Sequence, residues 1–239
     1  MSEPKSEYKV EVKNLTKYFG DLHVLNDISF NVRKGEFICI VGPTGCGKTT
    51  FLNLLTRIYM PSKGDLLIDG ESADPKKHNL AFVFQEPSSI PWKTVEENLS
   101  LAIRHLPEEE RKQRIREVLE LVRLPEVEAL YPSELSGRMA QRVGLARGII
   151  AKPDLLLLDE PFSALDFMTR SRLQMDFSKI QDELGMTMVL ITHDVNEAVL
   201  LSDKTVFLEE GKVKQEVNIA LPKPRRFGDQ NLLPLNLEN

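Results

Sequence analysis

The stretch that decides the fold is Phe37-Ile38-Cys39-Ile40-Val41, followed at once by Gly42-Pro43-Thr44-Gly45-Cys46-Gly47-Lys48-Thr49. The first part is an unbroken apolar run after the turn at Lys34-Gly35, as expected of a strand buried on both faces. The second part fits the pattern G-x-x-x-x-G-K-[ST], and an apolar helix around Phe51 follows it. A glycine-rich loop between such a strand and such a helix predicts a phosphate-binding loop.

The predicted loop has the physical properties needed to hold a polyphosphate. Its glycines allow the backbone to turn N–H groups inward, and the start of the helix adds positive potential. Lys48 is expected to reach the β- and γ-phosphates of ATP, and the Thr49 hydroxyl to bind Mg²⁺. Thr50 is expected to add a hydrogen bond nearer the α-phosphate. The alternative, a glycine-rich turn that arose by chance, is disfavoured by the strand and helix on either side.

Two adjacent carboxylates end another apolar run, because Leu155–Leu158 are followed by Asp159 and Glu160. Ligands of open α/β sheets bind at the carboxyl ends of the strands, so both acids are expected to face the phosphate loop. Asp159 is then the acid on the Mg²⁺ side, and Glu160 can polarise an attacking water. An acidic pair after a strand also fits a solvated turn, and its combination with the phosphate loop favours the catalytic interpretation.

Two further polar residues follow strand candidates. Gln85 comes after Ala81–Phe84, and His193 comes shortly after Met188–Ile191. Either residue alone is more typical of a structural hydrogen bond. Their joint placement at the sheet edge of Asp159 favours a functional role. We expect Gln85 to contact Mg²⁺ or the attacking water, and His193 to donate to the γ-phosphate.

The rest of the chain predicts an α/β domain with a largely parallel sheet and an inserted helical block. Short strands are expected from Tyr8 to Val41, helices from Pro91 to about Ala151, and alternating strands and helices afterwards. Within the helical block, one apolar face is formed by Ile115, Val118, Leu119 and Val122. We therefore expect one domain over 8–218, with a helical subdomain at about 91–151. The extension over 219–239 shows no clear period.

The composition is typical of a globular protein kept in the cytosol. Lys and Arg number 31 against 36 Asp and Glu, so no basic surplus indicates a nucleic-acid partner. No apolar run is long enough to cross a bilayer, and the first residues contain no signal peptide. Cys39 and Cys46 fit a reducing compartment better than a disulfide framework.

Several groups of residues occur in a set order from about Val10 to Val217. They are Gly42–Thr50, Gln85, Leu135-Ser136-Gly137, Leu155–Glu160, Ser163-Ala164-Leu165-Asp166 and Ile191-Thr192-His193-Asp194. This order resembles the ABC transporter ATPase family. The resemblance implies a RecA-like P-loop core of α/β class, with an antiparallel β subdomain and an inserted helical subdomain. It also implies Mg²⁺-dependent hydrolysis of ATP held between two ATPase subunits.

The resemblance implies roles that spacing alone does not give. Phe19 stands where the family has an aromatic ring that stacks on adenine, although Tyr18 is a neighbouring candidate and an ordinary core ring is an alternative. Ser136 and Gly137 open the signature helix, whose tip contacts the γ-phosphate of ATP bound to the partner subunit. A Ser cap and free N–H groups suit an anion there. Asp166, in the family's D-loop, is expected to signal across the same interface.

The signature departs from the family pattern at one position. The family usually reads L-S-G-G-Q, whereas this chain has Leu135-Ser136-Gly137-Arg138-Met139. Arg138 stands where the backbone should approach phosphate closely. Either Arg138 points away or pairs with phosphate and leaves activity intact, or it weakens this half-site. In the second case the working partner could be a different ATPase chain with an intact signature.

Three segments resemble the nitrate/sulfonate/taurine-type importers, namely Ser89–Asn98, Leu135–Val143 and Leu221–Arg225. This resemblance implies membrane permease subunits, a second ATPase subunit in a homo- or heterodimer, and indirectly a periplasmic or extracellular solute-binding protein. It places the chain at the cytoplasmic face of the membrane. Trp92, the single Trp, is expected either to meet the membrane subunit or to fill the core at the subdomain junction.

Three other function classes compete with this interpretation. A soluble ABC ATPase of DNA repair or translation normally carries coiled-coil, zinc-binding or tandem-domain additions, which this sequence does not show. A small-molecule phosphate-loop kinase leaves Ser136-Gly137, Asp166 and His193 without a purpose. A degenerate or regulatory subunit is suggested by Arg138. The solute is not encoded here, because other subunits choose it in this architecture.

Overall fold

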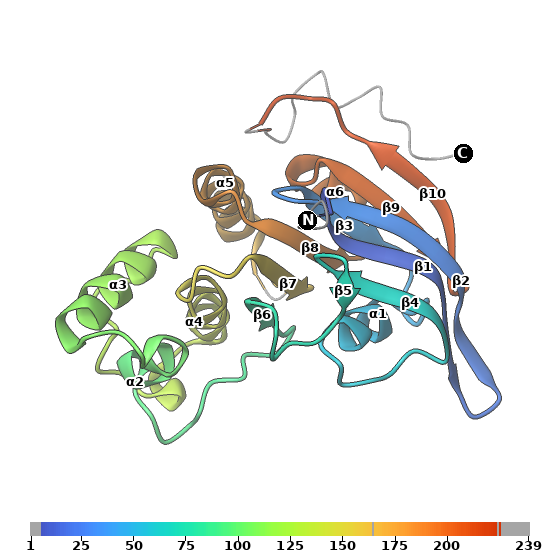
Figure 1. Ribbon diagram of the computed structural model, residues 1–239. Helices are drawn as coiled ribbons and strands as arrows, with labels where there is room; N and C mark the ends of the chain where they lie inside the picture. The colour runs from blue at the N-terminus through green and yellow to red at the C-terminus, as the bar shows by residue number, and fades with distance from the viewer. Residues whose placement is uncertain (1–5, 164, 224, 226–239) are drawn as a thin grey trace.

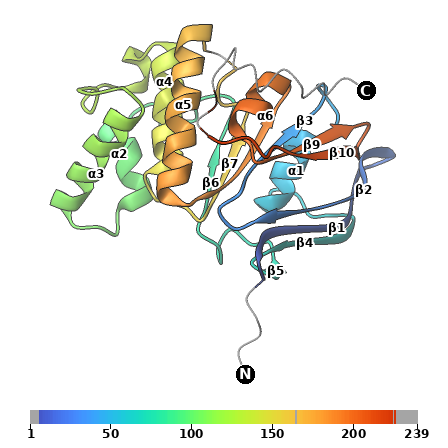
Figure 2. The same ribbon diagram turned by 90° about the horizontal axis from the view of Figure 1, so that it is seen from above.

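The computed structural model describes residues 6–163, 165–223 and 225, which form two sheets and a block of helices (Figure 1). One sheet has the strand order β2-β1-β4-β5, and the other, the core sheet, has the order β10-β9-β3-β8-β7-β6. The helical block lies on one side of the molecule and the smaller sheet on the other, with the core sheet between them (Figures 1 and 2).

The elements follow one another with short connections. The strands are β1 (Tyr8–Phe19), β2 (Leu22–Arg33), β3 (Phe37–Val41), β4 (Lys63–Ile68), β5 (Glu71–Ser72), β6 (Leu80–Val83), β7 (Leu155–Asp159), β8 (Thr187–Thr192), β9 (Lys204–Glu209) and β10 (Lys212–Asn218). The helices are α1 (Lys48–Leu55), α2 (Val95–Ser100), α3 (Glu108–Leu121), α4 (Gly137–Ile149), α5 (Phe167–Leu184) and α6 (Val195–Leu201), with 3₁₀ turns at Leu101–Ile103 and Pro132–Glu134.

The core sheet aligns the ends of its parallel strands. β3 pairs in parallel with β8 and β9, and β7 pairs in parallel with β6 and β8. In this register Val41 lies opposite Thr192, and Asp159 lies opposite Ile191. All residues of β3 and β8 are buried, as expected of parallel strands covered on both faces. The segments that follow β3, β6, β7 and β8 therefore start from one edge of the sheet.

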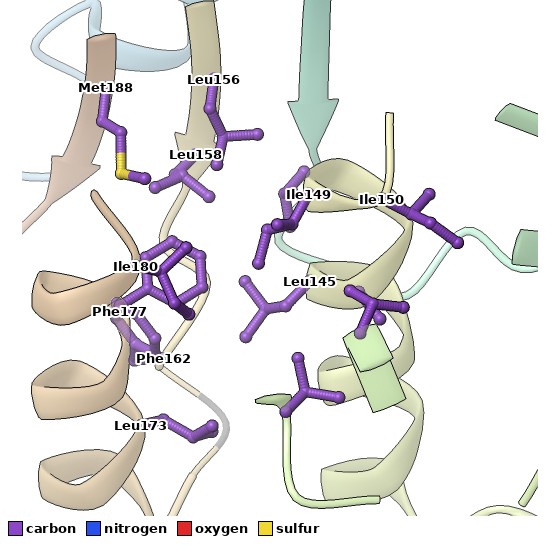
Figure 3. Close-up of a cluster of buried hydrophobic side chains, with 14 of the residues drawn as sticks. Leu145, Ile149, Ile150, Leu156, Leu158, Phe162, Leu173, Phe177, Ile180 and Met188 are labelled. Atoms are coloured by element: carbon purple, nitrogen blue, oxygen red, sulfur yellow. The ribbon is translucent and has the colours of Figure 1, made fainter. Parts of the chain in front are cut away.

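Apolar side chains fill both faces of the core sheet. On one face, α1 and the antiparallel strands β1, β2 and β4 share a cluster with β3 that includes Val10, Ile38 and Phe51. On the other face, Leu156, Leu158 and Met188 of the sheet meet side chains of α4 and α5 (Figure 3). These contacts position α4 against β7 and the segment that follows it.

The helical block is built from local signals that the sequence carries. α2 begins with a capping box in which Thr94 and Glu97 bond to each other's backbone N–H groups. α3 begins after Pro107 and buries the predicted apolar face. Its Ile115 is among the buried side chains that pack with α4. At Gly148 a Cβ would come within 2.5 Å of Val83 Cγ2, so the glycine allows α4 to lie close against β6.

The expected fold class is confirmed. The predicted strands at Phe37–Val41, Leu155–Leu158 and Met188–Ile191 are present, and α2, α3 and α4 lie between β6 and β7 in the chain. β10 was not predicted, because this edge strand exposes most of its side chains and alternates too weakly to give a pattern. No helix in the described part of the chain is both long and apolar enough to cross a membrane.

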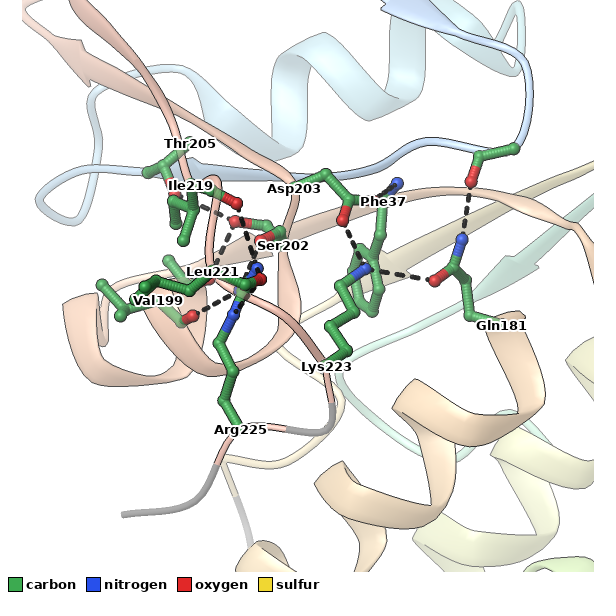
Figure 4. Close-up of polar contacts among 12 residues, drawn as sticks. Phe37, Gln181, Val199, Ser202, Asp203, Thr205, Ile219, Leu221, Lys223 and Arg225 are labelled. Carbon is green, nitrogen blue, oxygen red and sulfur yellow. Dashed lines mark hydrogen bonds and ion pairs between the residues drawn. The ribbon is translucent and has the colours of Figure 1, made fainter. Parts of the chain in front are cut away.

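The segment after β10 packs against α5, α6 and the residues that directly follow α6 (Figure 4). Arg225 is buried, and its guanidinium donates to the carbonyl oxygens of Val199, Ser202, Ile219 and Leu221. Lys223 Nζ lies 2.7 Å from Asp203 Oδ1 and donates to Gln181 Oε1 at 3.2 Å. The described part of the predicted extension is therefore fastened to α5 and α6, while residues 226–239 and Pro224 lie outside the described residues.

Candidate active site

The loop between β3 and α1 needs glycine for steric reasons at two positions. A Cβ at Gly42 would collide with the carbonyl oxygen of Leu208. Gly47 has a φ of 108°, and a Cβ there would lie 2.6 Å from Leu25 Cδ2 and 2.9 Å from Val24 O. L side chains rarely adopt such a positive φ. β2 therefore passes directly over the loop, and this packing holds the loop in place at the N-terminus of α1.

Lys48 is the buried cation at the centre of this loop. Its Nζ donates to Gly42 O at 2.6 Å and to Pro43 O at 3.0 Å, and it lies 4.0 Å from Cys46 Sγ. Pro43, Thr44 and Gly45 are exposed, so the outer turn of the loop faces solvent. The Lys48 side chain thus stabilises the loop from inside. Its two hydrogen bonds to carbonyl oxygens are contacts that hydrogen bonds to a phosphate can replace.

Asp159 is brought next to the start of α1. It is buried, and burial together with the adjacent Glu160 charge raises the pKa of its carboxyl group. A hydrogen bond from the Thr49 side chain and the charge of Lys48 act in the opposite direction and lower that pKa. The predicted meeting of the loop and the strand-end acid is therefore present in the folded chain.

Glu160 and His193 form a close pair beside Asp159. His193 Nδ1 lies 3.0 Å from Glu160 Oε2. Glu160 has a φ of 44°, in the left-handed region that costs energy for a residue with a Cβ. Its N–H donates to Ile191 O at 3.0 Å and its carbonyl accepts from Ser163, so the strained backbone is held at both ends. This backbone directs the carboxylate towards the residue after β8.

Gln85 lies apart from Thr49 and Asp159 in the contacts described. It is exposed and lines a cleft of about 810 Å³ together with Ser136, Gly137, Arg138, Gln141 and Ser163. Ser136 caps α4 by accepting the N–H of Met139 at 3.3 Å, as the sequence predicted for the helix start. A Cβ at Gly137 would meet no other atom within 4 Å, so the first turn of α4 is open to an approaching group.

Arg138 forms an ion pair that neither interpretation of the sequence included. Its Nη1 lies 3.1 Å from Asp166 Oδ2 of the same chain. Asp166 also caps α5 by accepting the N–H of Thr169, and this hydrogen bond, followed by the Arg138 charge, lowers the pKa of its carboxyl group. Ala164 of the same motif lies outside the described residues.

Sequence reasoning also missed Gln141 and Arg170. Gln141 Nε2 donates to Pro161 O at 2.9 Å, and Arg170 Nη2 donates to Leu165 O at 3.0 Å. Arg170 Nη1 lies 3.8 Å from Asp194. Arg170 follows Asp166 by one helical turn, and this spacing predicts that the two residues lie close together. The hydrogen bond from Arg170 to the carbonyl oxygen of Leu165 has no signal in the sequence.

Two aromatic residues are more exposed than a core role allows. Phe19 is partly exposed at the β1–β2 hairpin, with Lys17 Nζ 4.7 Å from its ring centre and Tyr59 packed edge-on against it. Tyr18 stacks instead on His23. Trp92 is 76% exposed, so the alternative that it fills the core at the subdomain junction is wrong.

The chemistry of the donor set suits Mg²⁺. Mg²⁺ prefers hard oxygen ligands and is held in nucleotide sites by one or two protein groups together with phosphates. The Thr49 hydroxyl and the Asp159 carboxylate are oxygen ligands that lie close enough for the Thr49 side chain to lower the pKa of Asp159, while burial raises that pKa. Cys39 and Cys46 are both buried and free.

Comparison with known proteins gives the same assignment. The ABC transporter family model matches residues 25–163. The chain is 40% identical to the aliphatic sulfonates import ATP-binding protein SsuB of Bacillus cereus, over 90% of this chain and 88% of that protein. It is 42% identical to the nitrate import ATP-binding protein NrtC of Synechococcus elongatus, over 87% of this chain but only 32% of that longer protein.

A solved structure extends the likeness to three dimensions. The dimeric ATP-binding cassette MJ0796, captured after hydrolysis with ADP and Pi, superimposes with a TM-score of 0.80 at 33% identity, covering 88% of this chain and 98% of that one. Family match, close relatives and fold agree with the loop, acid pair and signature helix described above. The chain therefore belongs to the ABC transporter family, as one of its ATP-binding ATPases.

Proposed function

We propose that this chain hydrolyses ATP to drive the import of a small solute, working as a peripheral subunit on the cytoplasmic face of a membrane. The observation that carries the proposal is the convergence of Lys48, Thr49, Asp159, Glu160 and His193 at one edge of the core sheet. The relatives named for nitrate and sulfonate import suggest a solute of similar size, chosen by other subunits.

The phosphates of ATP would bind in the loop of residues 42–50. The backbone N–H groups and the N-terminus of α1 attract the anion, and Lys48 exchanges its contacts with Gly42 O and Pro43 O for the β- and γ-phosphates. Thr50 supports the α-phosphate side. Phe19, with Lys17 over its ring, offers an exposed aromatic surface for adenine.

Thr49 and Asp159 are the residues that would hold Mg²⁺, with Gln85 reaching it or the attacking water from the cleft. When bound, the ion neutralises charge that develops on the phosphates. Among the described residues Gln85 forms no hydrogen bond with Thr49 or Asp159 and lines the cleft beside Ser136 and Ser163, so its part in this set requires it to move towards the ion.

Glu160 would orient the attacking water and accept its proton. Such general-base catalysis requires a carboxylate fixed in place near the γ-phosphate. The contact with His193 Nδ1 fixes one carboxylate oxygen of Glu160, and the backbone bonds to Ile191 and Ser163 fix the other end. His193 is largely exposed on its outer side, and that side would meet the γ-phosphate.

A second ATPase subunit would complete the site. The open first turn of α4, with Ser136 and Gly137, presents unpaired backbone N–H groups to solvent, the arrangement that binds anions. In the proposed dimer these groups contact the γ-phosphate of ATP bound to the partner, and Asp166 contacts the partner chain. Closure with ATP and reopening after hydrolysis would move the attached membrane subunits.

The membrane subunit would dock near Trp92. Trp92 and Tyr131 are both exposed, and the bond from Val95 N to Leu130 O at 2.9 Å places their two segments side by side. Exposed large rings mark protein contact sites. Because this segment directly follows the Gln85 region, a force on Trp92 would be transmitted to the cleft.

The test is co-purification from membranes, followed by ATPase measurement with and without the captured partners. A tagged full chain is expected to retain permease subunits and to hydrolyse ATP faster with them. Trp92→Ala should lose the partners while the activity of the isolated chain is unchanged. Capture of no membrane protein, with full ATPase activity in the isolated chain, would argue against the transport role and leave the hydrolytic role standing.

A further inference from the structure

Besides apolar packing, two polar side chains of the signature helix α4, Gln141 and Arg138, contact described residues of the segment between β7 and α5. One contact is the buried hydrogen bond from Gln141 to Pro161 O, which is shielded from solvent. The other is the ion pair of Arg138 and Asp166, whose side chains are 62% and 37% exposed. The first contact joins two buried groups, whereas the Arg138 side chain of the second is largely exposed and can return to water, so the second contact is the easier of the two to break.

Asp166 uses both of its carboxylate oxygens inside its own chain. Oδ1 accepts the N–H of Thr169 at 3.2 Å and so caps α5. Oδ2 is shielded from solvent and accepts no hydrogen bond from the described residues, so the Arg138 guanidinium at 3.1 Å supplies its electrostatic compensation. While Arg138 is in place, Oδ2 of Asp166 is therefore not accessible to a partner chain.

The loop around Asp166 also reaches the other catalytic segment. Arg170 donates to Leu165 O and lies 3.8 Å from Asp194, which caps α6 directly after His193. Arg138 therefore adds the signature helix to a set of charged contacts that already links the D-loop to the His193 segment. A residue with no side chain at position 138, as in the usual family pattern, could make no such connection.

We propose that the Arg138–Asp166 ion pair is an intrachain brake on closure of the ATP-bound dimer, with Arg138 competing against the partner subunit for Asp166. This inference rests on the proposed function. Closure then requires the pair to separate in each chain. Because the Arg138 side chain is 62% exposed, the net contribution of the pair is small, and removing it should change an equilibrium on the order of two- to fivefold.

The experiment measures the ATP concentration that gives half-maximal dimerisation, by sedimentation velocity, in full-length chains that carry Glu160→Gln to prevent turnover. Adding Arg138→Gln, which keeps a good helix former but removes the charge, is expected to lower this concentration about two- to fivefold. Arg123→Gln is the matched control, because Arg123 is similarly exposed (54%) and pairs with Asp176 away from the cleft. It should leave the concentration unchanged.

Ionic strength separates a charge effect from a steric one. Salt screens exposed pairs, so the ratio between the two proteins should fall towards one as salt rises from about 0.05 M to about 0.5 M. An unchanged or raised ATP requirement in the Arg138→Gln protein, or a salt-independent ratio, would overturn the brake. Failure of the Glu160→Gln chain to dimerise at any ATP concentration would overturn the proposed dimer and the brake together.

Discussion

The two halves of the proposed site differ in how completely one chain assembles them. At the edge of the core sheet, Lys48, Asp159, Glu160 and His193 are already paired with neighbours and held by backbone contacts. At the cleft, the first turn of α4 with Ser136 and Gly137 is open to solvent. The difference teaches that one chain holds the residues at the sheet edge in place by itself but leaves the start of α4 open, which is what the proposed function expects if a second subunit completes the site.

The physical reason for the difference lies in the supporting structure. The hydrolytic half rests on parallel strands that are buried on both faces and locked in register. The signature half rests on one helix whose N-terminal turn projects beyond the apolar cluster that fixes its other end. Substitutions in the first half should therefore abolish chemistry or nucleotide binding, and those in the second should affect its activation.

The largest effect is expected from Glu160→Gln. If Glu160 is the general base, turnover should fall by about 10²–10⁴, because the amide cannot accept the proton from water. ATP binding should survive, since the loop of residues 42–50 is untouched. Steady-state ATPase rates together with a nucleotide-binding titration test this, and unchanged turnover would remove Glu160 from its role.

Lys48→Ala should abolish nucleotide binding rather than slow turnover alone. The substitution removes the loop's buried cation and the Lys48 hydrogen bonds to Gly42 O and Pro43 O, of which Pro43 O keeps the N–H of Cys46 as a donor. Isothermal titration with MgATP measures the affinity. Full affinity in this variant would show that the loop holds phosphate without its lysine and would contradict the proposed arrangement.

Ser136→Ala tests the second half of the site, the first turn of α4 at the cleft. Loss of the α4 cap should cost about 1 kcal/mol of stability, or a few degrees of Tm. It should also reduce turnover while leaving ATP binding to the isolated chain intact. Thr94→Ala removes the cap of α2 and is the matched control. The two variants should lose similar stability, and equal turnover in both would mean that Ser136 acts only as a cap.

The smallest effect concerns stability and pH. Folding raises the pKa of Asp159, so the folded chain binds this proton more tightly than the unfolded chain. The contribution of Asp159 to the unfolding free energy therefore falls as pH rises from below its ordinary pKa to above the raised one, and the cost persists at neutral pH. Asp159→Asn should therefore raise the nucleotide-free Tm at pH 7.

The same variant should lose the extra stabilisation that Mg²⁺ adds to bound ATP. Thermal unfolding with and without MgATP, compared between pH 4 and pH 7, measures both effects. A Tm at pH 7 that falls in the Asn variant would mean that the buried carboxylate is stabilising, and the charge argument for a cation site would fail.

The sequence predicts the strands that carry the proposed hydrolytic residues, because the signals for these strands are local. Apolar runs locate the strands, and the common direction of parallel strands brings Asp159, Glu160 and His193 to one edge. The direct contact of Glu160 with His193 was not predicted, since the left-handed backbone of Glu160 has no sequence signal. The edge at which a residue lies follows from the direction of its strand. The contact between Glu160 and His193 depends on the left-handed backbone of Glu160.

The cleft half could be predicted only in part. The start of α4 follows from Ser136, but the position of Arg138 depends on how the helical block docks on the core sheet. The exposure of Trp92 depends on the same docking. The burial of Arg225 depends on four carbonyl groups brought together by α6 and the segment after β10 (Figure 4). Contacts between side chains that are far apart in the sequence produce no periodic pattern in that sequence.

The concentration dependence of ATP hydrolysis tests the division of labour between the two halves most directly. The specific ATPase activity of the isolated full chain is measured over a wide dilution series at saturating MgATP. If two chains complete each site, activity per chain should rise with chain concentration and level off as dimers form. Constant specific activity down to concentrations at which sedimentation shows only monomers would contradict the account.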